Sequence, residues 1–502
     1  MHKPSPHQTL LLGEEPISIE TLRQVARDRR RITLSHRLER RLQQARAVVD
    51  RHVEQNKPVY GLTTGLGATA DTRLSQEDMI AYQYRAIPAR AVGVGPRLPT
   101  DAVRAMMFAR LAGLAAGGSG GSYTLAEALA GALNAGFHPI VPSIGSIGAG
   151  DLAPLAHMGL AMIGQGEAEW GGQILPAVEA LQRAGLQPVD LRHKDGHVLI
   201  VANSLSVGRG ALAAHDIDDM LNIFNLAWAM SMEAFRGNVS PIDARACAAR
   251  PAPGQENEAA RLRALLHGSA LFTVGEARRL QDPLSFRCAA PVHGAARSAL
   301  DLVREAIEIE LTHSADNPIV LTEAEAILSN GNFDMTALSL RFEMLGQALA
   351  HVGTLSARRA NKLMAANFSG LPRFLSPLGA SWQGFQTVQK TISALESDVR
   401  QRAQPVPLTL LPVSDSVEDH AANTPASVAK THEMVERLAY LAAIEMIVAA
   451  QAIDMRKLDK LGEGAERGYR TIRRHVAFLE EDRALGPAFD AVAQAIFDGA
   501  FA

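Results

Sequence analysis

The chain has 502 residues and a formal net charge of −3, with 47% apolar, 21% charged and 5% aromatic residues. This length supports a large core with two or three lobes, and the near-neutral charge gives no reason to expect nucleic acid or a membrane as a partner. Only two cysteines are present, which excludes a disulfide framework. Because residues 1–20 also lack a signal-like apolar run, we expect a cytoplasmic protein.

Helical periodicity of apolar residues dominates the chain. In chain order, helices are expected at residues 36–56, 101–116, 124–136, 205–235, 290–315, 335–365, 383–404 and 425–459. Strands are scarce, with HVLIV (197–201) as the best candidate. The apolar segment 438–455 contains Glu445, Gln451 and Asp454, so we expect a buried helix there rather than a membrane span.

Loops rich in glycine interrupt the first part of the chain. GGSGGS (117–122) is followed by no lysine in P-loop spacing and is predicted to be a turn. We expect a mainly α fold with three parts: an N-terminal active-site lobe with Gly-rich loops (1–200), a central bundle of long helices that forms the oligomer core (201–460), and a helical tail (461–502).

The segment GSIGAGDLAPLAHMG (145–159) has the pattern of a loop that runs into a helix. Asp151 suits the N-cap position and Pro154 is tolerated in a first turn. Backbone N–H groups at such a helix start form an electropositive pocket. The centre of this loop, Ala149 and Gly150, nevertheless has no reactive side chain.

Other segments carry candidate functional side chains, each with a structural alternative. Tyr60 lies in the Gly-rich stretch 59–71, where its phenol can reach a ligand or can be a buried ring with a satisfied hydroxyl. Arg287 can clamp a carboxylate or serve structure. EDH (418–420) suits acid–base chemistry or a polar network. His193 and His197 are four residues apart, but no glutamate follows in zincin spacing and we expect no metal site.

Seven segments together resemble motifs of the aromatic amino acid lyase family, which includes histidine, phenylalanine and tyrosine ammonia-lyases and related aminomutases. The similarity covers roughly residues 20–470. The matching segments are VYGLTTGLG (59–67), GSIGAGDLAPLAHMG (145–159), RPAPGQ (250–255), QDPLSFRC (281–288), ADNPIV (315–320), GNF (331–333) and EDH (418–420). The resemblance implies a helical fold of the histidine ammonia-lyase (fumarase/aspartase-like) type. It also implies a homotetramer whose active sites are shared between subunits.

The resemblance raises a question about the cofactor. In the family, an Ala-Ser-Gly sequence cyclises to an electrophilic methylidene-imidazolone, MIO, and the serine supplies its reactive carbon. Here Ala149 is followed directly by Gly150, and Ser146 matches an earlier serine of the family motif. We therefore expect no MIO and no other cofactor.

Comparison with the family motifs separates retained from altered site residues. The resemblance assigns catalytic positions to Tyr60, Glu418, Ala149 and Gly150. It assigns substrate-binding positions to Arg90, Asn203, Arg287, Phe333, Asp334 and Asp398. Arg90 replaces the family's selectivity histidine, Asp334 replaces the histidine of GNFH, and Asp398 aligns with a glutamate of histidases. The altered positions also include Thr63, Leu284 and Val417.

These changes indicate an altered substrate. Without MIO, the substrate must supply its own leaving group, and a quaternary ammonium leaves as a neutral amine. Ergothionases, a branch of the family, split ergothioneine, a trimethylated 2-thiohistidine, into trimethylamine and thiourocanate. We expect a similar carbon–nitrogen lyase for a small amino-acid-like betaine. A conventional histidine or aromatic amino acid ammonia-lyase and a non-catalytic tetrameric binding or scaffolding protein are the alternatives.

Overall fold

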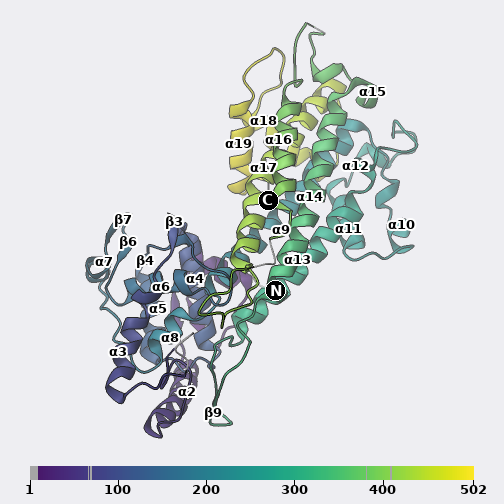
Figure 1. Ribbon diagram of the computed structural model, residues 1–502. Coiled ribbons are helices and arrows are strands. Elements are labelled where there is room, and N and C mark those ends of the chain that lie inside the picture. Colours follow the sequence, from purple (N-terminus) through teal and green to yellow (C-terminus); the bar gives the residue numbers. More distant parts are fainter. Residues whose placement is uncertain are drawn as a thin grey trace. The chain divides into compact units, whose positions relative to one another are not determined.

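The computed structural model describes residues 9–65, 67, 71–379, 381–406, 410–458 and 460–501. The described chain is mainly helical, as the sequence predicts (Figure 1). It divides into two compact units. The first comprises Met1–His215, Val303–Leu340 and Val406–Ala429, and the second comprises Asp216–Leu302, Arg341–Pro405 and Lys430–Ala502. This division by contacts differs from the chain-order division expected above, because segments from the second half of the chain belong to the first unit.

Short helices and small sheets make up much of the first unit. Its helices, up to the first long helix, are α1 (Ile19–Ala26), α2 (His36–Glu54), α3 (Gln76–Ala86), α4 (Thr100–Ala115), α5 (Tyr123–Ala135), α6 (Leu152–Met162), α7 (Ala177–Arg183), α8 (Asp195–Ile200) and the 3-10 turn η2 (Pro88–Arg90). Its strands are β1 (Leu10–Leu12), β2 (Ile32–Leu34), β3 (Val94–Arg97), β4 (His138–Pro139), β5 (Pro142–Ile144), β6 (Glu167–Trp170), β7 (Gln173–Pro176), β8 (Ile319–Leu321) and β9 (Ala326–Leu328). Strands β1 and β2 pair in parallel, whereas the pairs β3–β5, β4–β6, β6–β7 and β8–β9 are antiparallel.

Long helices make up much of the second unit. The remaining helices are α9 (Ser204–Phe235), α10 (Ala244–Ala248), α11 (Gln255–Leu265), α12 (Leu284–Arg287), α13 (Ala289–Thr312), α14 (Thr336–Met364), α15 (Ala366–Ser369), α16 (Val388–Arg402), α17 (Thr424–Arg456), α18 (Glu463–His475) and α19 (Gly486–Phe497), with 3-10 turns η3 (Ser240–Ile242), η4 (Ala270–Phe272) and η5 (Arg373–Leu375). Four boundaries between the two units fall inside α9, α13, α14 and α17, and a fifth lies between Pro405 and Val406, after the end of α16. The long helices expected from periodicity are therefore confirmed.

Close packing joins the helices of the second unit. A Cβ added at Gly353 of α14 would lie 2.9 Å from Leu438 of α17 and 3.7 Å from Val399 of α16, and Figure 1 shows these helices as neighbours. Arg359 and Glu445 form a fully buried ion pair between α14 and α17, with nitrogen and oxygen 2.5 Å apart. Loss of either partner would be strongly destabilising, because it would leave an unpaired charge in the protein interior.

Two helical stretches, Asp195–Phe235 and Thr424–Arg456, are long and apolar enough to cross a membrane by length and composition. In their most apolar windows, 89% and 83% of the residues are buried inside the protein. Such burial is typical of core helices, which confirms the expectation of a buried helix at residues 438–455.

The expected strand at residues 197–201 is wrong. Residues Asp195–Ile200 form the helix α8, and each of its residues is buried. A short apolar run predicts burial but does not distinguish a buried strand from a buried helix, because both lack an exposed face to set the period.

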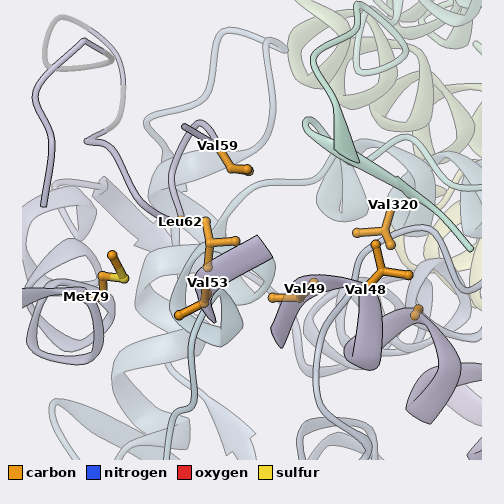
Figure 2. Packing of buried hydrophobic residues seen from close by; sticks show 8 residues of the cluster. Val48, Val49, Val53, Val59, Leu62, Met79 and Val320 are labelled. Atoms are coloured by element: carbon orange, nitrogen blue, oxygen red, sulfur yellow. The ribbon is translucent and has the colours of Figure 1, made fainter. Parts of the chain in front are cut away.

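A hydrophobic cluster in the first unit anchors the loop that carries Tyr60. Its members are Ala45, Val48, Val49 and Val53 of α2, Val59 and Leu62 of the loop, Met79 of α3 and Val320 of β8. Figure 2 shows the side chains of Val53 and Leu62 close together. A fully buried valine or leucine contributes about 1.5–3 kcal/mol. Burial of the residues on both sides of Tyr60-Gly61 therefore fixes this loop to the core.

Candidate active site

The Gly-rich loop (residues 145–151) has a conformation that requires glycine. Gly148 and Gly150 have φ values of +85° and +75°, which other residues rarely adopt. A Cβ at Gly148 would lie 2.9 Å from the backbone nitrogen of Thr424, so this glycine also permits a close approach between two segments. The N–H of Asn423 donates to the carbonyl of Ile147 at 3.0 Å and joins the same two segments.

Asp151 ends this loop and organises it from inside the protein. The residue occupies the N-cap position of α6 as expected, but its side chain does not cap the helix. Its carboxylate instead accepts hydrogen bonds from the hydroxyl of Ser146 at 2.7 Å and from the N–H of Ser206 at 2.8 Å. Complete burial raises the pKa of Asp151, and these donors oppose that effect. The hydroxyl of Ser146 is thereby committed to shaping the loop.

Asn203 connects the centre of the Gly-rich loop to the segment that contains Phe333 and Asp334. Its Oδ1 accepts from the N–H of Gly150 at 3.0 Å, and its Nδ2 donates to the carbonyl of Phe333 at 2.7 Å. Ala149 and Asp334 form an isolated antiparallel bridge. Four residues that the resemblance placed in the site are thus held together with Asn203 by backbone and amide hydrogen bonds.

Tyr60 lies half-buried in its loop. Its hydroxyl oxygen accepts a hydrogen bond from the N–H of Gly67 at 2.9 Å. Its ring meets the ring of His197 edge to face, with centroids 6.0 Å apart and planes at 84°. The N–H of Gly67 therefore orients the phenol at its oxygen, and the imidazole of His197 orients it at its ring.

Glu418 lies on a tight turn that comes close to the Tyr60 loop. The hydroxyl of Ser414 donates to its Oε1 at 2.8 Å, and Ser414, Asp415 and Ser416 all have φ values between +53° and +66°. A Cβ added at Gly67 would lie 3.9 Å from Oε1 of Glu418. Gly67 therefore has the Tyr60 hydroxyl on one side and the Glu418 carboxylate on the other.

Charged side chains surround these groups. Arg90, in η2, donates from Nη1 to the carbonyl of Ala86 at 3.1 Å, and its positive charge contributes to lowering the pKa of His197. Asp334 lies 3.3 Å from Nε2 of His420 through its Oδ2, while its Oδ1 accepts from the N–H of Thr336 at 3.0 Å. The predicted site residues of the first unit therefore include a guanidinium, Arg90, and the carboxylates of Asp334 and Glu418.

The two remaining predicted site residues belong to the second unit. Arg287, the last residue of α12, donates from Nη1 to Oε1 of Gln281 at 2.5 Å. Asp398 of α16 accepts from Nε of Arg437 at 2.9 Å and also pairs with Arg402 at 3.5 Å. Asp398 thus has two cationic partners within its own unit, and its role toward a substrate stays a prediction.

Several residues that shape the site were missed by sequence reasoning. Gln83 and His197 are buried behind the Tyr60 loop, and Asp151 was considered only as a helix cap. No motif marks Gln83, and the sequence presents His197 as half of a possible metal pair and as the first residue of an expected strand. Within the described parts of the chain, no group of three His, Cys, Asp or Glu residues is arranged to hold a metal ion.

Comparisons with known proteins give a consistent relationship. The model of the aromatic amino acid lyase family matches residues 17–474. A histidine ammonia-lyase of Alkaliphilus oremlandii is 37% identical over 491 residues, which cover 98% of this chain and 97% of the relative.

Solved structures agree with this relationship. Ergothionase from Treponema denticola, in complex with desmethyl-ergothioneine sulfonic acid, is 34% identical with a TM-score of 0.95 and covers 98% of this chain and 99% of that chain. Histidine ammonia-lyase from Trypanosoma cruzi is 30% identical with a TM-score of 0.90, covering 98% and 94%. The chain therefore belongs to the aromatic amino acid lyase family and is a carbon–nitrogen lyase, as its motifs indicated.

Proposed function

We propose that this lyase releases trimethylamine from a histidine-like betaine, as ergothionase does with ergothioneine, and that it works without MIO. The observation that carries the proposal is the direct Ala149-Gly150 junction inside an otherwise complete loop. The nearby hydroxyl of Ser146 donates to Asp151 and accepts from the N–H of Gly148 at 3.2 Å. The residues present therefore do not fit the formation of MIO, and the reaction has to proceed without it.

The reaction is an α,β-elimination in which the substrate supplies its leaving group. Tyr60 takes a proton from the β-carbon, the electrons of that C–H bond form the C=C bond, and the C–N bond breaks with its electron pair on trimethylamine. Trimethylamine departs as a neutral molecule, so the leaving nitrogen needs no proton. The products are trimethylamine, a conjugated acrylate and the proton now held by Tyr60, and these three together account for all the atoms of the substrate.

The charged side chains match the parts of such a substrate. Arg287 supplies a guanidinium that can bind the carboxylate with two hydrogen bonds. Arg90 favours an anionic thioimidazole ring, and Asp334 and Asp398 favour a trimethylammonium group that has no N–H to donate. Complementary charge in a water-shielded site is usually the largest contribution to catalysis.

A conventional histidine ammonia-lyase is the second candidate, because curated relatives at 35–37% identity bear that name. A histidine ammonia-lyase would have to expel the amine of histidine, a poor leaving group, although no serine stands between Ala149 and Gly150. A homotetramer with shared sites and a cytoplasmic location are further parts of the proposal. They are supported by the family relationship.

Incubation with ergothioneine and, separately, with histidine tests the proposal. We expect ergothioneine to give near-UV absorbance of a conjugated acrylate together with an equal amount of trimethylamine, and histidine to give no ammonia. Release of ammonia from histidine, phenylalanine or tyrosine without any reaction of ergothioneine would contradict the proposal.

The mass of the intact protein tests the absence of MIO independently of activity. We expect the mass of the unmodified chain, because cyclisation would remove two water molecules. Borohydride should leave the activity unchanged, since no electrophile is present to reduce. A deficit of two waters that maps to the peptide of residues 145–159 would overturn this part of the proposal.

A further inference from the structure

The ring of Tyr60 contacts a buried imidazole that the proposed reaction does not use. His197 is the third residue of α8 and only 3% of it is exposed. Its ring lies edge to face with that of Tyr60, at a centroid distance of 6.0 Å. The attraction between two such rings depends on their orientation, so a fixed imidazole restricts the phenol.

The imidazole of His197 is itself fixed in one tautomer and one charge state. Its Nε2 lies 2.9 Å from the carbonyl oxygen of Asn317, which can only accept, so Nε2 carries the hydrogen. Burial lowers the pKa of His197 to about 3, and the positive charge of Lys194 acts in the same direction. The ring is therefore neutral near physiological pH and held by a single directed hydrogen bond.

Gln83 provides a second connection between His197 and the Tyr60 loop. The backbone N–H of His197 donates to Oε1 of Gln83 at 3.0 Å, which turns the amide nitrogen toward the carbonyl of Gly61 at 3.5 Å. The side chain of Gln83 is buried, and a Cβ at Gly196 would lie 2.4 Å from the carbonyl oxygen of Gln83. Helix α8 thus packs directly against α3, whose Gln83 also contacts the carbonyl of Gly61, the residue after Tyr60.

Asn317 provides a third connection, toward the substrate-binding segment. While its carbonyl accepts from His197, its side-chain Oδ1 accepts from the N–H of Asn330 at 3.0 Å. Residue 330 begins the segment that leads to Phe333 and Asp334. His197 therefore lies at the junction between the Tyr60 loop and the segment that carries Asp334.

We infer that His197 is a positioning residue for Tyr60, which it orients through the ring contact while Gln83 and Asn317 fix the imidazole. His197 does not touch the reacting atoms. The inference rests on the proposed function only where it takes Tyr60 to be the base. Its structural part, that His197 orders the Tyr60 loop, holds for any substrate.

Two substitutions separate the ring contact from the hydrogen bond. His197→Phe keeps an aromatic ring against Tyr60 and removes the donor to Asn317, whereas His197→Gln keeps an N–H donor and removes the ring. His138→Gln is the matched control. His138 is a buried histidine of the same unit whose Nε2 lies 3.1 Å from Nη1 of Arg104, away from the site residues.

We expect His197→Gln to lower kcat by about ten- to hundredfold with KM changed less than about threefold, because a small misplacement of a base slows proton transfer more than binding. His197→Phe should stay within about fivefold of the wild-type kcat, since the phenol keeps its neighbouring ring. His138→Gln should leave kcat unchanged. A kcat for His197→Gln within about threefold of wild type, or an equal loss in both His197 variants, overturns the role of the ring contact.

Hydrogen–deuterium exchange supplies a readout that needs no substrate. The peptide of residues 57–65 should exchange faster in His197→Gln than in wild type and in His138→Gln. Unchanged exchange in His197→Gln overturns the inference. If the wild-type protein turns over no betaine, the proposed function fails while this measurement still decides the role of His197.

Discussion

The Gly-rich loop (residues 145–151) and the segment of residues 413–420 both contribute to the candidate active site, but they are held in different ways. The Gly-rich loop is fixed by buried hydrogen bonds to Asp151 and Asn203. The segment 413–420 is exposed over most of its length and is held by Ser414 and by the pair of His420 with Asp334. The buried framework therefore fixes the shape of the candidate site, and in the proposed function the exposed charged groups select the substrate.

This difference bears on whether the site is active. The Gly-rich loop lacks the reactive serine of its family, yet the network of Asp151, Ser146 and Ser206 that shapes it is complete. A site without function is not expected to keep a costly buried carboxylate with its donors. The comparison favours a lyase whose altered charges accept a substrate with its own leaving group.

The largest effect is expected at Arg287, where the substitution keeps the positive charge and tests whether bidentate binding of a carboxylate is needed. Arg287→Lys should weaken transition-state stabilisation by about 2–4 kcal/mol, because one ammonium cannot reproduce a bidentate fork. This corresponds to a fall in kcat/KM on the order of thirtyfold to thousandfold, with little change in the melting temperature. Normal turnover by Arg287→Lys would make Arg287 a structural residue and would refute the role implied by QDPLSFRC.

The next effect is expected at Asn203, which tests the buried framework. Asn203→Ala removes the partners of the Gly150 N–H and the Phe333 carbonyl, and kcat should fall by about a hundredfold because the loop loses its fixed position. Asn134→Ala is the matched control, since Asn134 also bridges two backbone groups, both of Ile32, away from the site. Both variants should lose stability, and only Asn203→Ala should lose kcat. Equal kcat values in the two variants would mean that the framework has no catalytic role.

The fold, and the loops that hold the candidate site, were predictable from the sequence for a physical reason. Glycines that favour positive φ, long helical periods of apolar residues and the motif at residues 145–159 are local signals. They can be recognised in the sequence without knowledge of tertiary contacts. The resemblance also names both Asn203 and Gly150, and the structure joins them by a hydrogen bond, while the role of Asn203 toward a substrate stays a prediction.

The rest of the site depends on contacts between distant segments. Gln83 and His197 are separated by 114 positions, and no local pattern connects them. The apolar run of α8 suggested a strand because burial on all sides hides the helical period. The two cationic partners of Asp398 also come from tertiary packing, so its ion pairs were not foreseen.

A smaller effect is expected when the charges at Arg90 and Asp398 are changed one at a time. Arg90→His removes most of a positive charge near neutral pH, and Asp398→Asn keeps the shape of the side chain while removing its charge. Each should lower turnover of a betaine by at least about tenfold, or roughly 1.4 kcal/mol. Neither should create ammonia release from histidine.

The ion pairs of Asp398 require a control for this experiment. Arg437 lies 2.6 Å from Glu436 as well as 2.9 Å from Asp398, so Glu436→Gln also removes a partner of Arg437. We expect Glu436→Gln to leave turnover unchanged. If Glu436→Gln slows the reaction as much as Asp398→Asn does, the charge of Asp398 acts through Arg437 rather than on the substrate.

The smallest effect is a pH dependence of the free energy of unfolding, for which the buried His197 is compared with the exposed His420. The pKa of His197 is lowered to about 3, whereas an unfolded histidine titrates near 6.5. Between these values the unfolded chain binds the proton and the folded chain does not, so the free energy of unfolding falls as the pH falls below about 6.5. His197 alone should account for about 1 kcal/mol of this loss between pH 6.5 and 5.5.

His197→Gln should therefore show a shallower decline in the midpoint of urea unfolding than wild type over this range. His420→Gln is the exposed comparison, because the side chain of His420 is 71% exposed. A decline in His197→Gln as steep as in wild type would show that the imidazole of His197 takes up its proton in the folded protein. The buried imidazole would then be charged in the folded protein, and its burial would not set it apart from the exposed groups.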